Sequence, residues 1–339
     1  MSVSNPITLT ILFPILLLAC KDKTTEIITT ERRIEMYDPE LQQVLDSNVI
    51  IEILTDSVYQ WAEGPLWLDE EHKLLFTDVP QNTIYSWDEK NGPQKYLSPS
   101  GYTIINEKGG REGANGLALD ADSHLILCQH GNRAVAKMKS PLTTPKDSFE
   151  FLAMNYKGRK FNSPNDLHIT KDGDIFFTDP PYGLPGQDAD SIKELSFNGV
   201  YRLIKKDGSV FLLDSTLSRP NGIALSSDEK YMYVANSDPE KSIWKKYELD
   251  VHKNIVSASL FADVTHLVPK HKGLPDGMKI SNKGYIFASG PGGILVFNQD
   301  SRHLGTIMTG QATANCALDK DEKYLYMTAH KYLMRVRLK

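Results

Sequence analysis

Six side chains that carry oxygen recur at matching places in a repeated pattern. Each begins a unit that continues with an apolar stretch, a polar turn and a second apolar stretch. The six are Glu63, Asn115, Asn165, Asn221, Asp276 and Asn315. Two carboxylates and several amide oxygens around one point would bind a hard divalent cation. Ca²⁺ is favoured because it accepts about six to eight oxygen ligands in loose geometry, with Mg²⁺, Mn²⁺ or Zn²⁺ as alternatives.

A simpler explanation exists for individual members of this set. Asn and Asp are common in turns, and Asn-Gly and Asp-Gly pairs are frequent turn signals. Turn chemistry does not explain Glu63, which lies before Gly-Pro in the stretch WAEGPLWL, nor the absence of Ser and Lys from the six positions. The HExxH and paired CxxC patterns typical of zinc sites do not occur. The cation hypothesis therefore requires that the six side chains converge.

The elements that would bring them together are β-strands. Apolar and polar residues alternate with period two between Asp-Gly, Asn-Gly and Asp-Glu-Lys turns, and amphipathic helices are scarce. The six units start 39 to 56 residues apart, close to the roughly 40 to 50 residues of a four-stranded propeller blade. We expect an all-β fold, a six-bladed β-propeller over residues 48–339, with the six side chains at one mouth of its channel. A pair of β-sandwiches would leave the repeat unexplained.

Third strands are expected where TIYSW, AVAKM, GVYRL, SIWKKY and GILVF follow the second apolar stretch. Fourth strands should lie in the more variable sequence between units. Propeller rings usually close with strands from both ends of the chain, and residues 50–54 are the N-terminal candidates.

Composition narrows the classes of partner. The 339 residues are 40% hydrophobic and 24% charged, with 38 Lys and Arg residues against 43 Asp and Glu residues. Neither the net charge of -5 nor any basic run indicates nucleic-acid binding. Cys128 and Cys316 lie in apolar, strand-like runs, which predicts buried free thiols rather than a disulfide framework.

The first residues read as an export signal. MSVSNPITLTILFPILLLAC is uncharged and ends in an apolar run that is short for a membrane span. Leu17-Leu18-Ala19-Cys20 resembles the lipobox of bacterial lipoproteins. We expect a signal peptide over 1–19, a lipidated Cys20, and a flexible tether over 20–47. The lipid anchor would be the only membrane contact of the protein, which we expect to be a monomer in the periplasm or on the outer membrane. The alternative is an ordinary signal peptide and a secreted protein.

Six short motifs carry a family resemblance. EGPLW, CQHGNR, NSPNDL, FTDPPYG, RPNGIAL and LPDGMKI, in this order, resemble the gluconolactonase branch of the family that includes regucalcin and the luciferin-regenerating enzyme. The resemblance runs from about Glu63 to the C-terminus. It implies a six-bladed propeller with a divalent cation in the channel, in agreement with the repeats.

The resemblance also implies a ligand set. Glu63 in E-G-P, Asn221 in R-P-N-G and Asp276 in P-D-G-M fall on the family's metal ligands. Asn165 in S-P-N-D matches a position that ligates the metal in related phosphotriesterase-type propellers and contacts substrate or metal-bound water in regucalcin. Asn115 lies outside the usual set, as does Asn315, so both are expected to support the ligands or the fold.

The activity implied is hydrolysis of a sugar lactone such as gluconolactone. The cation would polarise the carbonyl, and Asp276 would serve as both ligand and general base. Asp166 could orient the site, act as an alternative base, or simply accept backbone amides in a turn.

Other candidates come from the residues themselves. His130 could stabilise the tetrahedral intermediate or move a proton, although a lone histidine is more often structural. Arg111 and Arg133 could hold a polar or anionic substrate at the rim, and Tyr182 could form part of the substrate wall or only pack in its loop. The rival functions are hydrolysis of other lactones, esters or phosphotriesters on the same scaffold, and a non-catalytic propeller that binds a sugar or a protein.

Overall fold

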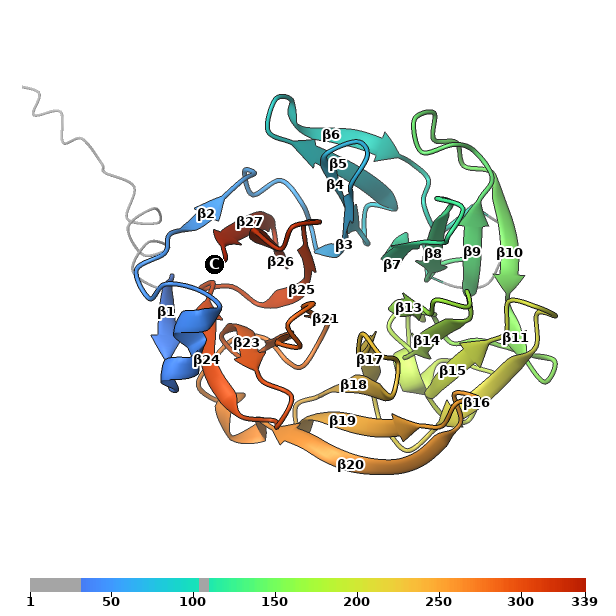
Figure 1. Ribbon diagram of the computed structural model, residues 1–339. Helices are drawn as coiled ribbons and strands as arrows, with labels where there is room; N and C mark the ends of the chain where they lie inside the picture. The colour runs from blue at the N-terminus through green and yellow to red at the C-terminus, as the bar shows by residue number, and fades with distance from the viewer. Residues whose placement is uncertain (1–31, 104–109) are drawn as a thin grey trace, which may run out of the picture.

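The computed structural model describes residues 32–103 and 110–339. Within these ranges, six antiparallel sheets of four or five strands stand around a central channel (Figure 1). The strands β3, β7, β13, β17, β21 and β25 lie innermost, one from each sheet. The prediction of a six-bladed β-propeller is confirmed.

Each of the first three blades runs outward from the channel through four consecutive strands. Blade 1 contains β3 (Ala62–Leu68), β4 (Lys73–Asp78), β5 (Thr83–Asp88) and β6 (Gly92–Leu97). Blade 2 contains β7 (Ala114–Leu119), β8 (Leu125–Gln129), β9 (Ala134–Met138) and β10 (Phe149–Ala153). Blade 3 contains β13 (Leu167–Ile169), β14 (Ile175–Asp179), β15 (Gly199–Leu203) and β16 (Val210–Asp214).

The other three blades repeat this order, and the last two also take strands from the N-terminal segment. Blade 4 contains β17 (Pro220–Leu225), β18 (Tyr231–Asp238), β19 (Lys241–Leu249) and β20 (Ile255–Asp263). Blade 5 contains β21 (Met278–Ile280), β22 (Ile286–Gly290), β23 (Gly293–Phe297), β24 (His303–Met308) and β1 (Arg33–Met36). Blade 6 contains β25 (Thr313–Leu318), β26 (Tyr324–Ala329), β27 (Tyr332–Arg337) and β2 (Ile51–Ile53).

The ring closes as expected, because β2 forms the outer strand of blade 6 with Ile51 paired to Val336. The expected tether over 20–47 is wrong in its second half. β1 pairs with β24, and a 3-10 helix, η1 (Pro39–Gln43), follows it. Leu41, Val44 and Leu45 are buried in the cluster between blades 5 and 6, so this segment is part of the fold.

Short elements complete the described chain. They are the hairpin of β11 (Asn155–Tyr156) with β12 (Arg159–Lys160) and the 3-10 helices η2 (Gln187–Ala189) and η3 (Thr265–Leu267). The signal peptide expected over 1–19 and the lipidated Cys20 lie outside the described residues. Among helices in the described ranges, none has the length and apolar character needed to cross a membrane.

The core is a ring of apolar clusters between neighbouring blades. Each of six clusters draws its buried residues from two adjacent sheets. Between blades 2 and 3, for example, the Phe177 and Tyr201 rings stack with centroids 5.2 Å apart, and Cys128 is buried with them. Cys128 and Cys316 are both buried free thiols, as predicted. Packing between each pair of neighbouring blades therefore holds the inner strands in place around the channel.

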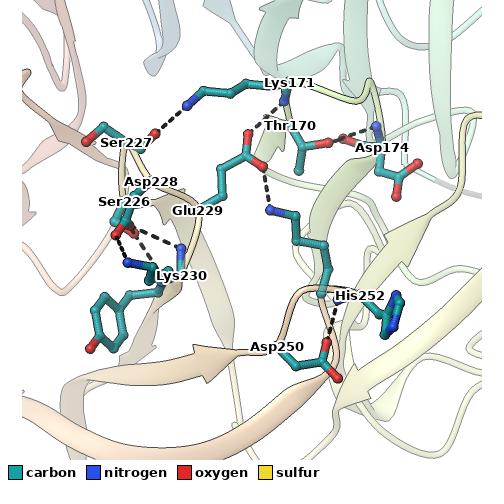
Figure 2. A network of polar contacts seen from close by, with 12 residues as sticks. Thr170, Lys171, Asp174, Ser226, Ser227, Asp228, Glu229, Lys230, Asp250 and His252 are labelled. Carbon is teal, nitrogen blue, oxygen red and sulfur yellow. Dashed lines mark hydrogen bonds and ion pairs between the residues drawn. The ribbon is translucent and has the colours of Figure 1, made fainter.

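Hydrogen bonds join neighbouring blades 3 and 4 where their turns between inner and second strands meet. Figure 2 shows the junction of blades 3 and 4, where Glu229 accepts the backbone N–H of Lys171 at 2.7 Å and the ammonium of Lys253 at 2.5 Å. Lys171 in turn donates its ammonium to the carbonyl of Ser227 at 2.7 Å. Burial raises the pKa of Glu229, but the hydrogen bonds from Lys253 and Lys171 outweigh it, so the pKa is lowered overall.

Candidate functional site

A cavity of about 340 Å³ lies where the inner strands begin, at the opposite end of the blades from these turns. It is lined by six of the residues that the sequence singled out for chemistry: Glu63, Asn165, Asn221, Asp276, His130 and Tyr182. Asn115, expected to play a supporting part, lines the cavity as well. The predicted convergence at one mouth of the channel is therefore found for five of the six repeated positions.

In blades 1 and 3, an aspartate at the end of the second strand fixes the segment that leads into the cavity. On β4, Asp78 accepts the backbone N–H of Trp61 at 3.2 Å, two residues before Glu63. On β14, Asp179 accepts the N–H of Ser163 at 2.8 Å, two residues before Asn165. The last residue of each F-T-D motif thus fixes the approach of a cavity side chain.

The threonine of the same motif reaches the next blade. Thr77 donates its hydroxyl to the carbonyl of Asn115 at 3.2 Å, and Thr178 donates to the carbonyl of Asn221 at 2.7 Å. Glycine is required nearby, since a Cβ on Gly222 would collide with the backbone oxygen of Asp276. Asn115 and Asn221 therefore lie in strands at tight contacts between blades, and a turn is not the reason for their Asn-Gly sequence.

Amide groups form a chain across the cavity. Asn115 donates its Nδ2 to the Oδ1 of Asn165 at 2.9 Å, and Asn165 donates its own Nδ2 to the Oδ1 of Asn221 at 2.5 Å. The Nε2 of His130 lies 3.0 Å from the same Oδ1 of Asn165, and its Nδ1 lies 3.1 Å from Oε2 of Glu112. Glu112 thereby orients the imidazole, and the Asn165 oxygen meets two partners.

Negative charge is concentrated behind the cavity mouth. Burial, then the charge of Asp166, raises the pKa of Glu63 to about 7. Burial, then the charges of Glu63 and Asp166, holds the pKa of Asp276 well above its ordinary value. The charge of Lys279 acts against burial at Asp166, but the carboxyl groups of Glu63, Asp166 and Asp276 still repel one another, and a bound cation would relieve that repulsion.

The donor set fits a hard cation. Among the described residues, the buried Oδ1 atoms of Asn115 and Asp276 have no hydrogen-bond partner. Both residues line the cavity, and they come from blades 2 and 5, which face each other across the channel. Carboxylate and amide oxygens that are buried and unsatisfied are what Ca²⁺ or Mg²⁺ would require.

Two of the candidate polar residues lie behind the cavity wall. Asp166 is buried, accepts the backbone N–H of Leu167 at 2.9 Å, and is absent from the lining. Asn315 donates to Asp166 at 3.5 Å and accepts the N–H of Cys316 at 2.9 Å, so its amide is satisfied within the fold. Of the roles considered for Asp166, these contacts favour a carboxylate that accepts backbone amides.

Neither predicted rim arginine lies in the cavity wall. Arg133 is only 3% exposed, and its guanidinium donates to the carbonyls of Phe161 and Ile192 at 2.6 and 3.2 Å. The expectation that it holds a substrate at the rim is therefore wrong, because those backbone contacts turn its side chain from blade 2 toward blade 3 and away from the cavity. Arg111 is exposed on the loop before β7 and is not part of the lining.

The wall contains residues that the sequence did not single out. They are Trp61, Val79, Pro80, Glu112, Gln187, Arg219, Ser237 and Leu274. Trp61 and Arg219 each lie two residues before a proposed ligand, inside WAEGP and RPNG. The sequence could have indicated both residues, because residues i and i+2 of a strand point to the same face and each lies two positions before a proposed ligand.

A second group of potential ligands lies elsewhere. Asp120, Asp122 and His124 have ligand atoms within 4.8 Å of one another in the turn between β7 and β8. Asp120 accepts the backbone N–H groups of Asp122 and His124, at 2.9 and 2.8 Å, so it is occupied by the turn itself. The turn lies at the far end of β7 from Asn115.

Comparison with known proteins places this geometry in a family. The chain is 39% identical over 318 residues to a gluconolactonase from Zymomonas mobilis, covering 92% of this chain and 87% of the relative. It resembles the solved structure of a gluconolactonase from Xanthomonas campestris with a TM-score of 0.77 and 28% identity, over 91% and 95% of the two chains. A calcium-binding protein, regucalcin, from Agrobacterium tumefaciens shares the fold with a TM-score of 0.67 at 17% identity, over 86% and 95% of the chains. Residues 61–331 match the SMP-30/gluconolactonase/LRE-like region, and the chain belongs to that family.

Proposed function

We propose that the protein is a metal-dependent lactonase that opens a sugar lactone, gluconolactone being the reference substrate. The observation that carries the proposal is the cavity itself, in which Glu63 and Asp276 meet the amide oxygens of the channel. The likeness to the Zymomonas mobilis gluconolactonase supports the reaction class.

Glu63, Asn221 and Asp276 are the proposed ligands, and Asn165 is proposed to lie beside the cation. Ca²⁺ is the favoured ion because the donors are all oxygen and come from separate blades, which suits loose, high coordination. When bound, the cation supplies Lewis-acid polarisation of the lactone carbonyl.

The residues of the chain supply the proton chemistry. Asp276 accepts a proton from a water molecule as the water oxygen attacks the carbonyl carbon. The ring C–O bond then breaks, and the leaving alkoxide takes up a proton, which gives the open hydroxy acid. His130, held by Glu112 at 3.1 Å, is positioned at the wall to stabilise the charged intermediate or to return that proton.

The wall offers two kinds of contact to a sugar ring. Trp61 lines the cavity from blade 1 and makes an edge-on contact with His330 at 5.4 Å between ring centroids. Arg219 lines the cavity from the segment just before β17 of blade 4, a blade that stands across the channel from blade 1, and Tyr182 lines the same cavity. We propose that the indole packs on the apolar face of the sugar while Arg219 and Tyr182 bind its oxygens.

The test is hydrolysis of a lactone panel by the purified protein with Ca²⁺, Mg²⁺, Mn²⁺ or Zn²⁺ and with a chelator. Asp276→Asn should remove turnover while the folded state persists. Asp321→Asn, in the exposed turn before β26, is the matched control and should keep the wild-type rate. A folded, cation-loaded protein that opens no lactone or ester above background would contradict the enzyme and favour a binding propeller.

We also propose that the chain is exported and anchored through Cys20, on the pattern Leu17-Leu18-Ala19-Cys20 alone. Mass spectrometry of the cell-expressed protein should find a diacylglyceryl group on Cys20. A mature N-terminus elsewhere, without lipid, would contradict the anchor.

A further inference from the structure

Two buried oxygens that lack a hydrogen-bond partner belong to residues of the cavity wall, and one of the two residues, Asn115, lies outside the ligand set that the family resemblance implies. Asn115 is 5% exposed, lines the cavity, and leaves its Oδ1 without a hydrogen-bond partner in the described residues. A buried amide oxygen without a partner is unfavourable, because the hydrogen bonds that it makes with water in the unfolded chain are not replaced. Asp276 leaves an oxygen in the same condition in the same cavity.

The oxygen of Asn165 is placed differently. It accepts the Nδ2 of Asn115 at 2.9 Å, and the Nε2 of His130, which donates to it when that nitrogen carries the proton, lies 3.0 Å away. A carbonyl oxygen has two lone pairs, so these contacts use its capacity. The oxygen of Asn115 is therefore the more available cation ligand of the two. The NH₂ group of Asn115 fixes the oxygen of Asn165 by a hydrogen bond.

The backbone of Asn115 is fixed on both sides. Thr77 of blade 1 donates to its carbonyl oxygen at 3.2 Å. Gly64, with φ of 45°, lies against the same oxygen, where a Cβ would collide. On the other side, the N–H of Gly116 donates to the carbonyl of Asn165 at 2.8 Å. A side chain held this way is oriented before any ligand arrives, which limits the entropy cost of binding.

We propose that the Oδ1 of Asn115 is a direct ligand of the channel cation, together with Glu63, Asn221 and Asp276. The proposal rests on the cation site of the proposed function. Under it, Asn165 is a positioning residue that connects Asn115, His130 and Asn221 by hydrogen bonds. Asn315, the other asparagine outside the family's set, has no such role because its amide is satisfied by Asp166 and the backbone.

Two substitutions separate a ligand from a positioning residue. Asn115→Ala removes the oxygen, and Asn115→Asp keeps an oxygen, adds a charge and removes the NH₂ that Asn165 receives. A ligand predicts that calcium affinity falls at least tenfold in the Ala variant and rises in the Asp variant. A residue that acts only by holding Asn165 predicts weaker binding in both, since an aspartate would repel the Asn165 oxygen.

The measurement is calorimetric titration of chelator-treated protein with Ca²⁺ alone, which does not depend on turnover. Asn155→Asp, in the exposed β11–β12 hairpin, adds the same charge away from the channel and should leave the affinity unchanged. Tighter binding by Asn115→Asp with unchanged binding by Asn115→Ala would show a field effect only and overturn the ligand.

Instability of the Ala variant would not prevent a decision. The luminescence lifetime of Tb³⁺ in H₂O and D₂O counts the water molecules on the bound ion, and Asn115→Ser, which is smaller and polar, should gain one relative to wild type. An unchanged water count would overturn the proposal. If the wild-type protein binds none of Ca²⁺, Mg²⁺, Mn²⁺ and Zn²⁺, the proposed cation site is overturned as well. If it binds a cation but the Asn115 variants do not show the changes expected of a ligand, only this inference is overturned.

Discussion

Replacing Glu63 by glutamine should stabilise the cation-free protein and weaken its response to Ca²⁺. Burial and Asp166 raise the pKa of Glu63 from 4.5 to about 7. The rise in pKa corresponds to a cost of roughly 3 kcal/mol for keeping that carboxylate ionised in the folded protein.

The sign follows from linkage. A folded-state pKa above the unfolded value contributes stability that is complete below pH 4.5 and is lost as the pH rises through about 7. In chelator, the wild-type protein should thus lose stability between these pH values, and Glu63→Gln should lose less. At pH 8 the variant should melt roughly 5 °C higher, given about 2 °C per kcal/mol for a chain of this size.

Excess Ca²⁺ should reverse the order, because the variant has lost one of two anions among the proposed ligands. The assay is thermal unfolding in chelator and in Ca²⁺ across pH 5 to 8, with the exposed Glu248→Gln on β19 as control. A variant that is less stable than wild type in chelator, or equal stabilisation of both proteins by Ca²⁺, would refute the reasoning.

Three further predictions address the frame and the wall. Gly222→Ala should lower the free energy of unfolding by about 1–3 kcal/mol in urea, because its Cβ meets the backbone of Asp276; unchanged stability would contradict this close approach. Glu229→Gln should cost about 2 kcal/mol at pH 7 through the buried bond to Lys253, and the difference should close below pH 4.5, since the pKa of Glu229 is lowered; a gap independent of pH would be the opposite result. Trp61→Ala should raise KM for gluconolactone with little change in kcat in steady-state assays, and an unaltered KM would remove the indole from the substrate wall.

The repeat made the fold predictable from the sequence. Residues such as Glu63 and Asp276 occupy the same place in their repeat units, and similar blades around one axis bring such places together. The same logic predicted the closing strand at Ile51–Ile53. It could not reveal β1, because a four-residue strand has little periodicity and its partner β24 lies far along the chain.

Within the site, the sequence could not predict the direction in which each side chain points. Arg133 follows His130 in CQHGNR and was expected at the rim, yet its backbone φ of 56° is a left-handed conformation, and its guanidinium turns to the carbonyls of blade 3. Trp61 and Arg219 stood inside recognised motifs, but their exposure to the cavity depends on how neighbouring blades pack. The unpartnered oxygen of Asn115 could be seen only once its hydrogen bonds were known.

The most direct test of the cation site is an anomalous diffraction map from a crystal soaked in Mn²⁺. We predict a single strong peak in the channel mouth, in coordination contact with the carboxylates of Glu63 and Asp276 and the amide oxygen of Asn221. A channel without a peak, with Mn²⁺ found instead at Asp120, Asp122 and His124, would contradict it.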